Sequence, residues 1–382
     1  MKKVFIISSV LLAIALIFLG IYNFVYKNDS PEQLADAQKS SKNGGFLSGF
    51  ENEKKISVLV DSDVSNPILN ATGKTVLYYS KSESKAKSLI LDGTGRINEI
   101  SFEDRASGLS NAIISPKGDK IILAYKNGES TSIFLYEASS KSVKKIKDGI
   151  DDVFWDGLGN KIIYKYFDSR TGKRTINIAD PDGANWKPLA ELPYRYLSAS
   201  PIPTNSVISF WNSPDANQET ILQTAGIMGG EVKKIFSGKY GADYLWSPDG
   251  KRALVSATDT ADKSKIFLGI INGNGGEYRN FAVPTMVSKC VWTGNDEIIY
   301  AQPGSVPEGS VLPNDYLSGK FKSADTFWKM NVNDLKKERL IGEELMKEIN
   351  EKFDAANLIY SPEEDALLFV NRYNGKLYEL KL

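Results

Sequence analysis

The chain has 382 residues, with 47 basic and 47 acidic side chains and no histidine. The balanced charge argues against nucleic-acid binding as the main role, because such a partner needs a basic surface that neutralises phosphates. The absence of histidine excludes Ser-His-Asp catalysis and most zinc sites. The single cysteine, Cys290, cannot form an intramolecular disulfide, and we expect a buried, inert thiol.

The first apolar segment, residues 4–26, contains no charged side chain. As a helix it would be about 34 Å long, which is enough to cross a hydrocarbon core of ~30 Å. Its end lacks the small-residue cleavage pattern of a signal peptide. Lys2 and Lys3 precede it and acidic residues soon follow, so the positive-inside rule keeps the N-terminus in the cytoplasm. We therefore expect residues 1–26 to be an uncleaved, single-pass transmembrane anchor in the cytoplasmic (inner) membrane.

Residues 27–53 are polar and rich in Ser, Gly, Asn and Lys. This composition cannot bury a core, so we expect a flexible tether. The remaining residues, 54–382, are long enough to fold as one domain without a disulfide or a metal. We predict no cofactor and no metal site.

A recurring unit organises residues 54–382: a short apolar strand, a tight turn with Pro, Gly or Asp, and a strongly apolar strand. The seven turn segments begin at Asn70, Ser115, Asp156, Pro201, Ser247, Thr293 and Ser361. Most are separated by about 45 residues, the period of a four-stranded propeller blade. Third and fourth alternating strands complete each unit. The pattern predicts an all-β, seven-bladed β-propeller, with six or eight blades as alternatives because two units are degenerate.

The two ends of this domain indicate how the ring closes. The last unit supplies only three strands, whereas residues 54–63 resemble a spare fourth strand ahead of the first unit. Pairing them would complete the seventh blade and remove an exposed sheet edge. We therefore predict that one blade is closed by the N- and C-terminal strands.

Several turns also carry a family resemblance. The SPDG turn at Ser247, the SPKG turn at Ser115 and the DPDGANWKPL stretch from Asp180 resemble the WD40-like propeller repeats of the TolB type, found in bacterial envelope proteins. The resemblance covers about residues 54–382. It implies a propeller fold and does not specify a function.

Two insertions distinguish the sixth unit from the others. Residues 303–325 separate its second and third strands, and residues 343–354 follow its last strand. In the second insertion, Leu345, Ile349 and Phe353 recur at helical spacing and predict a short amphipathic helix. We expect both insertions on one rim, together with the connections between blades. Long loops on a rigid scaffold commonly carry binding functions; the alternative is a lid over apolar surface.

The same rim should collect aromatic, acidic and basic side chains that could stack on a sugar or clamp a peptide. The candidate ligand-binding or partner-binding residues are Tyr194, Arg195, Tyr196, Tyr240, Asp243, Tyr244, Asp315 and Tyr316. The alternative is that these tyrosines only pack between blades. No catalytic residues are predicted.

The chain lacks a G-x-S-x-G elbow, a phosphate loop and a dinucleotide fingerprint. We predict a noncatalytic extracytoplasmic binding or scaffold module that recognises an envelope protein or a cell-wall glycan. One alternative is a glycan hydrolase or lyase, which would need two carboxylates converging in one pocket with shifted titration. Another is a structural subunit of a secretion or pilus assembly, which would need a large exposed apolar patch near the insertions.

Overall fold

The computed structural model describes residues 55–100, 109–127 and 130–382. The chain divides into two units, Met1–Glu53 and Lys54–Leu382, and every described residue belongs to the second. The predicted membrane anchor and tether lie outside the described residues. Within the described ranges, no helix is both long and apolar enough to cross a bilayer.

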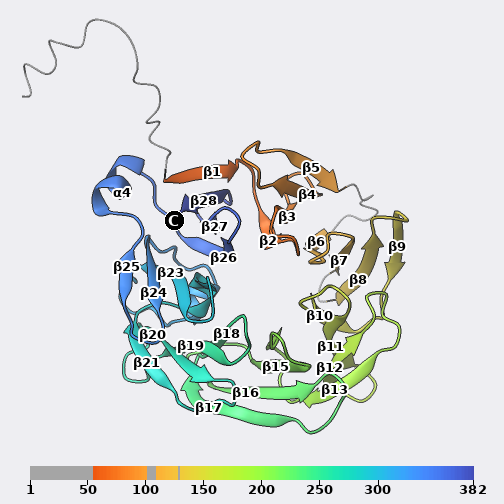
Figure 1. The fold of residues 1–382 in the computed structure, drawn as a ribbon. Coiled ribbons are helices and arrows are strands. Elements are labelled where there is room, and N and C mark those ends of the chain that lie inside the picture. Colours follow the sequence, from red (N-terminus) through yellow and green to blue (C-terminus); the bar gives the residue numbers. More distant parts are fainter. Residues whose placement is uncertain (1–54, 101–108, 128–129) are drawn as a thin grey trace, which may run out of the picture. The chain divides into compact units, whose positions relative to one another are not determined.

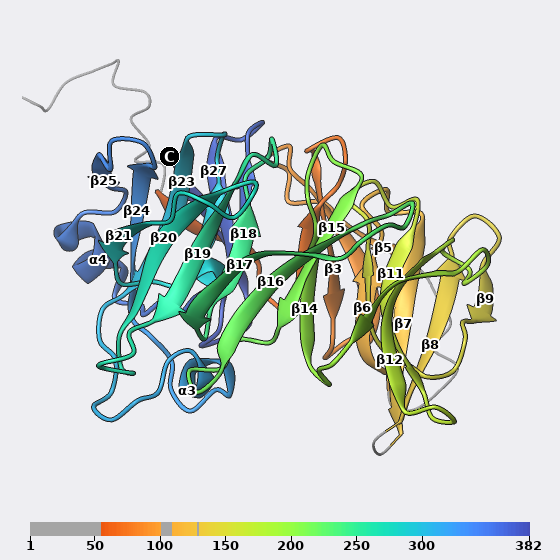
Figure 2. The same ribbon diagram turned by 90° about the horizontal axis from the view of Figure 1, so that it is seen from below.

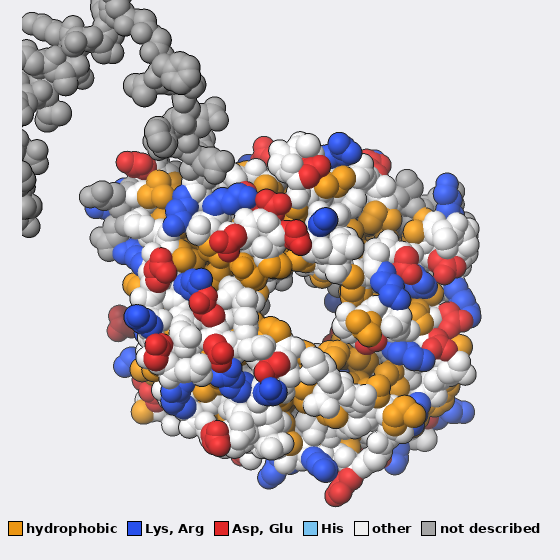
Figure 3. Space-filling view, viewed as in Figure 1, with side chains coloured by type: hydrophobic (Ala, Val, Ile, Leu, Met, Phe, Trp, Pro, Cys, Tyr) orange, Lys and Arg blue, Asp and Glu red, His pale blue; other side chains and the backbone are white. Residues whose placement is uncertain are grey.

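The second unit is a ring of seven four-stranded antiparallel sheets around a central opening (Figures 1 and 3). The prediction of seven blades is confirmed. Figure 1 places the first strands β2, β10, β18 and β26 beside the opening, and the fourth strands β5, β9, β13, β17, β21 and β25 at the outer edge.

The blades follow one another along the chain. Blade 1 contains β2 (Ser65–Leu69), β3 (Thr75–Ser80), β4 (Lys85–Ile90) and β5 (Ile97–Ile100). Blade 2 contains β6 (Leu109–Ile114), β7 (Lys120–Asn127), β8 (Ser130–Glu137) and β9 (Ser142–Lys145). Blade 3 contains β10 (Ile150–Trp155), β11 (Ile162–Asp168), β12 (Lys173–Ala179) and β13 (Lys187–Leu192). Blades 4 and 5 contain β14 (Leu197–Pro201), β15 (Val207–Asn212), β16 (Glu219–Gly226), β17 (Lys233–Tyr240); and β18 (Asp243–Trp246), β19 (Arg252–Thr258), β20 (Ile266–Asn272), β21 (Arg279–Val283). Blades 6 and 7 contain η1 (Val287–Lys289), β22 (Cys290–Trp292), β23 (Glu297–Pro303), β24 (Asp325–Asn331), β25 (Lys337–Arg339); and β26 (Ala355–Ser361), β27 (Ala366–Asn371), β28 (Leu377–Lys381), β1 (Ile56–Val60).

The core lies between neighbouring blades, where apolar side chains of their sheets interlock. Phe327 of blade 6 and Phe369 of blade 7 are fully buried, and their ring centroids are 4.9 Å apart. The second strands are the most apolar in sequence because neighbours cover both of their faces, as β27 shows with six buried residues. Cys290 is buried between blades 5 and 6, and burial raises the pKa of its thiol, as expected for an inert side chain.

The SPDG turn illustrates why the repeat carries its signature residues. Gly250 donates its backbone N–H to the carbonyl of Ser247 over 2.9 Å and has a left-handed φ of +67°. A Cβ on Gly250 would lie 2.3 Å from the carbonyl oxygen of Pro203 in the preceding blade. Only glycine satisfies both the turn and this close approach.

Blade 7 is closed by both ends of the domain. Its strand order is β26, β27, β28, β1, and Ile56 of β1 pairs with Leu380 of β28. The predicted closure is therefore confirmed.

The first strands differ between two parts of the ring. In blades 7, 1, 2 and 3, each first strand has one extra residue where its pairing register shifts, at β26, β2, β6 and β10. The first strands of blades 4, 5 and 6 pair without a shift. We call blades 7, 1, 2 and 3 the bulged arc and blades 4, 5 and 6 the regular arc.

The two insertions contain short helices, α3 (Asn314–Leu317) and α4 (Glu343–Ile349). Figure 2 shows α3 at the lower face of the ring and α4 on its flank, beside β25. The helix predicted to include Phe353 is shorter than expected. Asn350 adopts a left-handed φ of 49°, which ends α4, and Phe353 follows as a buried core residue. Leu345 and Ile349 pack against the same core cluster, so α4 covers apolar surface.

Candidate functional site

A groove of about 650 Å³ lies on the face that carries α3. Three segments line it: Pro193–Tyr196 between blades 3 and 4, the end of β15 at Asn212 with the following β15–β16 loop, and Asn314 of α3. Asn314 lies about a hundred residues further along the chain than the other two segments. We call it the Tyr-Arg-Tyr groove, after Tyr194, Arg195 and Tyr196. The structure therefore brings these three predicted residues together.

Hydrogen bonds to neighbouring strands hold the Tyr-Arg-Tyr segment in place. The hydroxyl of Tyr194 donates to Oε1 of Gln223 over 2.7 Å, and burial raises the pKa of this hydroxyl. The buried Lys165 donates from Nζ to the carbonyl of Arg195 over 2.7 Å. Tyr196 is 64% exposed, and the guanidinium carbon of Arg195 lies 5.5 Å from its ring centroid. A fixed backbone thus presents an aromatic ring and a cation to solvent.

The opposite wall is held by the first insertion. Asn314 accepts the backbone N–H of Ala216 over 2.8 Å and donates to Oδ1 of Asp215 over 2.9 Å. The hydrogen bond from Asn314 is the main reason that the pKa of Asp215 lies below its usual value. Asp215 therefore stays ionised at neutral pH and can accept hydrogen bonds in the groove.

Three predicted residues lie elsewhere, around blades 4 and 5. Tyr240 lines a separate pocket of about 310 Å³ with Lys239. Tyr244 is buried and packs against Trp211, with ring centroids 5.2 Å apart. Asp243 accepts a hydrogen bond from Nε1 of Trp211 over 3.0 Å, and burial raises its pKa to about 6. Asp243 and Tyr244 thus sit in the packing between blades.

The last two predicted residues belong to α3. Asp315 accepts the backbone N–H of Val311 over 2.8 Å and forms an ion pair with Lys320, both within the insertion. The hydrogen bond from Lys320 lowers the pKa of Asp315. Tyr316 is buried, and its hydroxyl donates to Oδ1 of Asp354 over 2.7 Å. Asp315 stabilises the insertion, and Tyr316 fastens it to the ring.

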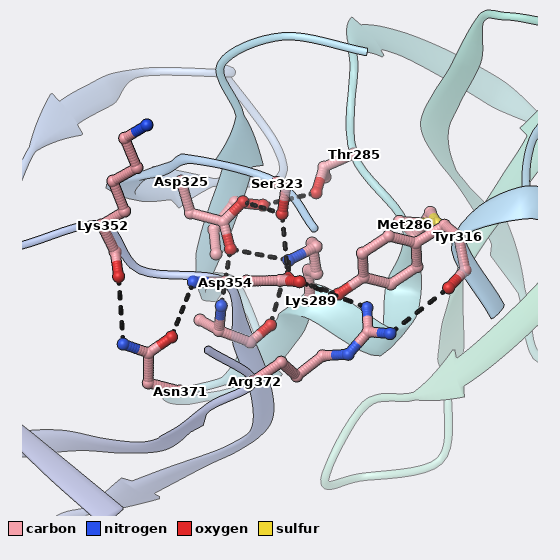
Figure 4. Close-up of polar contacts among 12 residues, drawn as sticks. Thr285, Met286, Lys289, Tyr316, Ser323, Asp325, Lys352, Asp354, Asn371 and Arg372 are labelled. Atoms are coloured by element: carbon pink, nitrogen blue, oxygen red, sulfur yellow. Dashed lines mark hydrogen bonds and ion pairs between the residues drawn. The ribbon is translucent and has the colours of Figure 1, made fainter. Parts of the chain in front are cut away.

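Tyr316 reaches a buried ionic cluster at the junction of blades 6 and 7 (Figure 4). Nζ of Lys289 lies 2.6 Å from Oδ2 of Asp325 and 2.8 Å from Oδ1 of Asp354, and these three side chains are fully buried. Arg372 lies 3.3 Å from the second oxygen of Asp354. We call these five residues the Lys289 cluster. They connect η1, β24, α3 and the segments flanking β26 and β27.

The charges of this cluster are mutually dependent. Burial opposes the charged form of Lys289, yet its two acidic neighbours keep its pKa above the usual value. Burial also opposes ionisation of Asp354, but Lys289 holds its pKa below the usual value. For Asp325, burial outweighs Lys289 and raises the pKa. Both carboxylates are enclosed together with a lysine, so neither is open to solvent.

One pocket of about 350 Å³ on the outer part of blades 2 and 3 contains two acidic side chains, Glu137 and Asp182. Each lies near a lysine: Lys120 is 3.7 Å from Glu137 and Lys144 is 2.8 Å from Asp182. The hydrogen bond from Lys144 lowers the pKa of Asp182. Within residues 55–100, 109–127 and 130–382, no group of three or more Cys, Asp or Glu side chains is arranged to hold a metal ion.

Sequence patterns gave no indication of Asn314, which completes the groove. Asn314 lies about a hundred residues from its partners Asp215 and Ala216, and no local pattern links them. The only signal for Lys289 was a charged residue directly before the apolar run Cys290–Trp292.

A further pocket, of about 530 Å³, lies among the first strands of the bulged arc. We call it the channel pocket. Its lining residues are Val64, Ser65, Asn66, Lys81, Ser110, Asn111, Ile113, Ala124, Lys126, Thr131, Ile133, Asp152, Val153 and Asn357. None of them was a candidate from sequence.

No family model matches the chain, and no curated protein matches it. Solved structures do share its fold. An oligogalacturonate lyase from Vibrio parahaemolyticus is 11% identical, with 88% of this chain and 96% of that chain covered at a TM-score of 0.59. The β-propeller domain of the Trilobed protease from Pyrococcus furiosus is 15% identical, with 85% and 94% covered at a TM-score of 0.51. A putative TolB from Agrobacterium tumefaciens is 17% identical, with 57% and 79% covered at a TM-score of 0.44.

These likenesses define the class of fold. The chain is a seven-bladed β-propeller, and the solved structures that support this class include the oligogalacturonate lyase and the propeller domain of the Trilobed protease. At identities this low, the shared property is the fold.

Proposed function

We propose that this protein is a noncatalytic binding module, held outside the cytoplasmic membrane by an anchor in residues 1–26. Its propeller presents the Tyr-Arg-Tyr groove to an envelope protein or a cell-wall glycan. The observation that carries the proposal is that three segments, one of them from the remote insertion in blade 6, are fixed around an exposed Tyr196 and Arg195.

A groove that is already in its binding conformation has a physical advantage. Binding a partner normally requires ordering of side chains and loops, and a preformed surface lowers this cost. Tyrosine and arginine are also the side chains enriched among residues that dominate binding energy. In the groove they stand on a backbone held by Lys165 and opposite a wall held by Asn314.

The two alternative functions have less support. The predicted alternative is a hydrolase or lyase that uses a carboxylate pair, in which one member must be able to hold a proton. The groove contains a single acidic residue, Asp215, whose pKa is lowered, and the Lys289 cluster is enclosed. A structural subunit would expose a broad apolar patch near the insertions. In α3 the large exposed apolar side chain is Leu317 alone, at 56% exposure.

The test is photo-crosslinking in native membranes with the full chain. One variant carries a benzophenone amino acid in place of Tyr196, and the control carries it in place of Leu158, in the β10–β11 turn. These two positions are similarly exposed, at 64% and 68%. We expect an adduct at position 196 that Arg195→Ala removes, and no adduct at position 158.

The adduct also identifies the kind of partner. Sensitivity to protease indicates an envelope protein, and sensitivity to cell-wall hydrolases indicates a glycan. Equal labelling at the two positions, or none at position 196, would contradict the proposed binding role of the groove.

A further inference from the structure

The channel pocket has the features of a second binding site. It is built by four consecutive blades, because β26, β2, β6 and β10 each contribute lining residues. These are the four first strands whose pairing register shifts. Its volume of about 530 Å³ is in the ordinary range for a small-ligand pocket.

The register shifts place irregular backbone at the pocket wall. Asn66 and Asn357 both have left-handed backbones, with φ of 49° and 52°. The extra residue of a bulge is not paired in the strand ladder, and bulges commonly re-aim side chains at binding sites. The regular arc has no such shift in its first strands. Among the first strands, register shifts therefore occur only in the four blades that line this pocket.

Side-chain amides and hydroxyls dominate the polar part of the lining. Asn66 donates from Nδ2 to Oδ1 of Asn111 and to the carbonyl of Ala112, the latter over 3.3 Å. Ser110 donates to the carbonyl of Ala124 over 2.9 Å. Asn357 of blade 7 is exposed and also lines the pocket. Amide groups pair well with peptide bonds, since both present an N–H and a carbonyl oxygen.

Two cations complete the lining. Lys81 directly follows β3 and Lys126 lies near the end of β7, so both stand where the second strand of a blade turns toward the third. Both are exposed, and among the described residues neither side chain takes part in an ion pair. The backbone beneath Lys81 is fixed, because its N–H donates to Oδ2 of Asp63 over 2.7 Å. Two lysines in one pocket with a single acidic residue, Asp152, favour an anionic ligand.

We propose that the channel pocket binds the C-terminal carboxylate of an extended peptide. Lys81 and Lys126 bind the carboxylate, and the asparagine amides with the bulged strands bind the last peptide units. No aromatic side chain lines the pocket, which makes sugar stacking a weaker match than a peptide backbone. The site is separate from the Tyr-Arg-Tyr groove, so it adds a second point of recognition to the proposed binding function.

The experiment measures fluorescence anisotropy with the purified full chain. The probe is an N-terminally labelled tetra-alanine peptide with a free carboxylate, and its matched control is the same peptide with a C-terminal amide. We expect the free acid to bind at least about tenfold more tightly, since charge-assisted hydrogen bonds to the carboxylate are lost on amidation. The preference should weaken as salt rises.

The protein variants locate the effect. The double variant Lys81→Gln with Lys126→Gln should bind both peptides equally and weakly. Lys74→Gln removes the same charge from the opposite end of β3 in the same blade and should keep the preference. Asn357→Gly preserves the left-handed backbone, removes one amide, and should weaken both peptides.

Three results would overturn the proposal: equal affinity for acid and amide, no binding of either peptide, or a preference that survives in the double lysine variant. A glucuronate trisaccharide serves as an additional probe. If it binds through the two lysines and the peptides do not, the pocket belongs to an acidic glycan and the peptide assignment is wrong. None of these results depends on crosslinking at Tyr196, so the two proposals fail separately.

Discussion

The regular arc and the bulged arc are built from the same repeating unit, yet their first strands pair differently and the surfaces beside them differ. In the regular arc, first strands pair without interruption, and the first insertion crosses from blade 6 to reach Asp215 of blade 4. In the bulged arc, first strands are interrupted and an open polar pocket lies between them. The comparison shows how a near-symmetric ring can be braced along one arc and remain accessible along the other.

Ring closure is the condition on which both arcs depend. Deleting residues 377–382 removes β28, which lies between β1 and β27, and leaves β1 without a partner. We expect loss of most of the roughly 5–15 kcal/mol by which a domain is stable. Thermal unfolding followed by circular dichroism checks this. A control permutant that joins residue 382 to residue 55 and opens the chain at Leu158 should unfold cooperatively. An unchanged Tm after the deletion would show that closure is dispensable.

The Lys289 cluster should contribute substantially to the stability of the folded ring. Lys289→Met leaves Asp325 and Asp354 buried without their cation, and we expect a loss of about 3–5 kcal/mol in the free energy of unfolding. Chemical denaturation gives the value. The control is Lys85→Met, which breaks a solvent-screened ion pair with Glu99 in the bulged arc and should have a much smaller effect on the free energy of unfolding. Similar losses in both variants would mean that the cluster does not brace the ring.

Asp243, in the regular arc, should make the stability of the protein depend on pH. Its pKa is raised to about 6 from an ordinary value of 3.8, so folding favours its protonated form. Its stabilising contribution is therefore fully present below pH 3.8 and is lost as the pH rises through 6. Asp243→Asn keeps an oxygen that can accept the hydrogen bond from Trp211. At neutral pH this variant should be more stable than the wild type, by at most about 3 kcal/mol. Unfolding curves at pH 4.5 and 7.5 should converge at the lower pH; parallel curves would refute the assignment.

The smallest effect concerns the strained backbone of the bulged arc. At a φ of 52°, asparagine is tolerated because its polar side chain can form local hydrogen bonds, and alanine lacks such a group. Asn357→Ala should therefore lower the free energy of unfolding by about 1 kcal/mol. Asn357→Gly should be near neutral because glycine tolerates this conformation. The difference between the two midpoints in urea is the measurement. If alanine and glycine are equivalent, position 357 does not need a left-handed backbone.

The fold could be predicted from sequence because its signals are local. Turns such as SPDG need only neighbouring residues, and all seven predicted turn segments lie between the first and second strands of a blade. The closing strand was predictable because a missing strand at one end matched a spare strand at the other. The amphipathic helix was predicted too long, since helical periodicity continued past Asn350, where the backbone turns.

The site was less accessible to prediction for the opposite reason. Tyr194, Arg195 and Tyr196 are adjacent in sequence and could be selected together, but Asn314 meets them only through the folded ring. Tyr244 is a tyrosine like the exposed Tyr196, and only the structure shows that Tyr244 is buried. The bulges at Asn66 and Asn357 also lack a local signal, because their effect depends on the register of the next strand.

The pairing of β1 with β28 has a further consequence for the order of events during synthesis. β1 leaves the ribosome first among the described strands, and β28 leaves last. At ~5–20 residues per second, the chain between them takes from about a quarter of a minute to about a minute to make. During that interval β1 has an unsatisfied edge and six blades can form beside it. Blade 7 can therefore be completed only after β28 has been made, and any factor that shields β1 until then should raise the yield of closed rings.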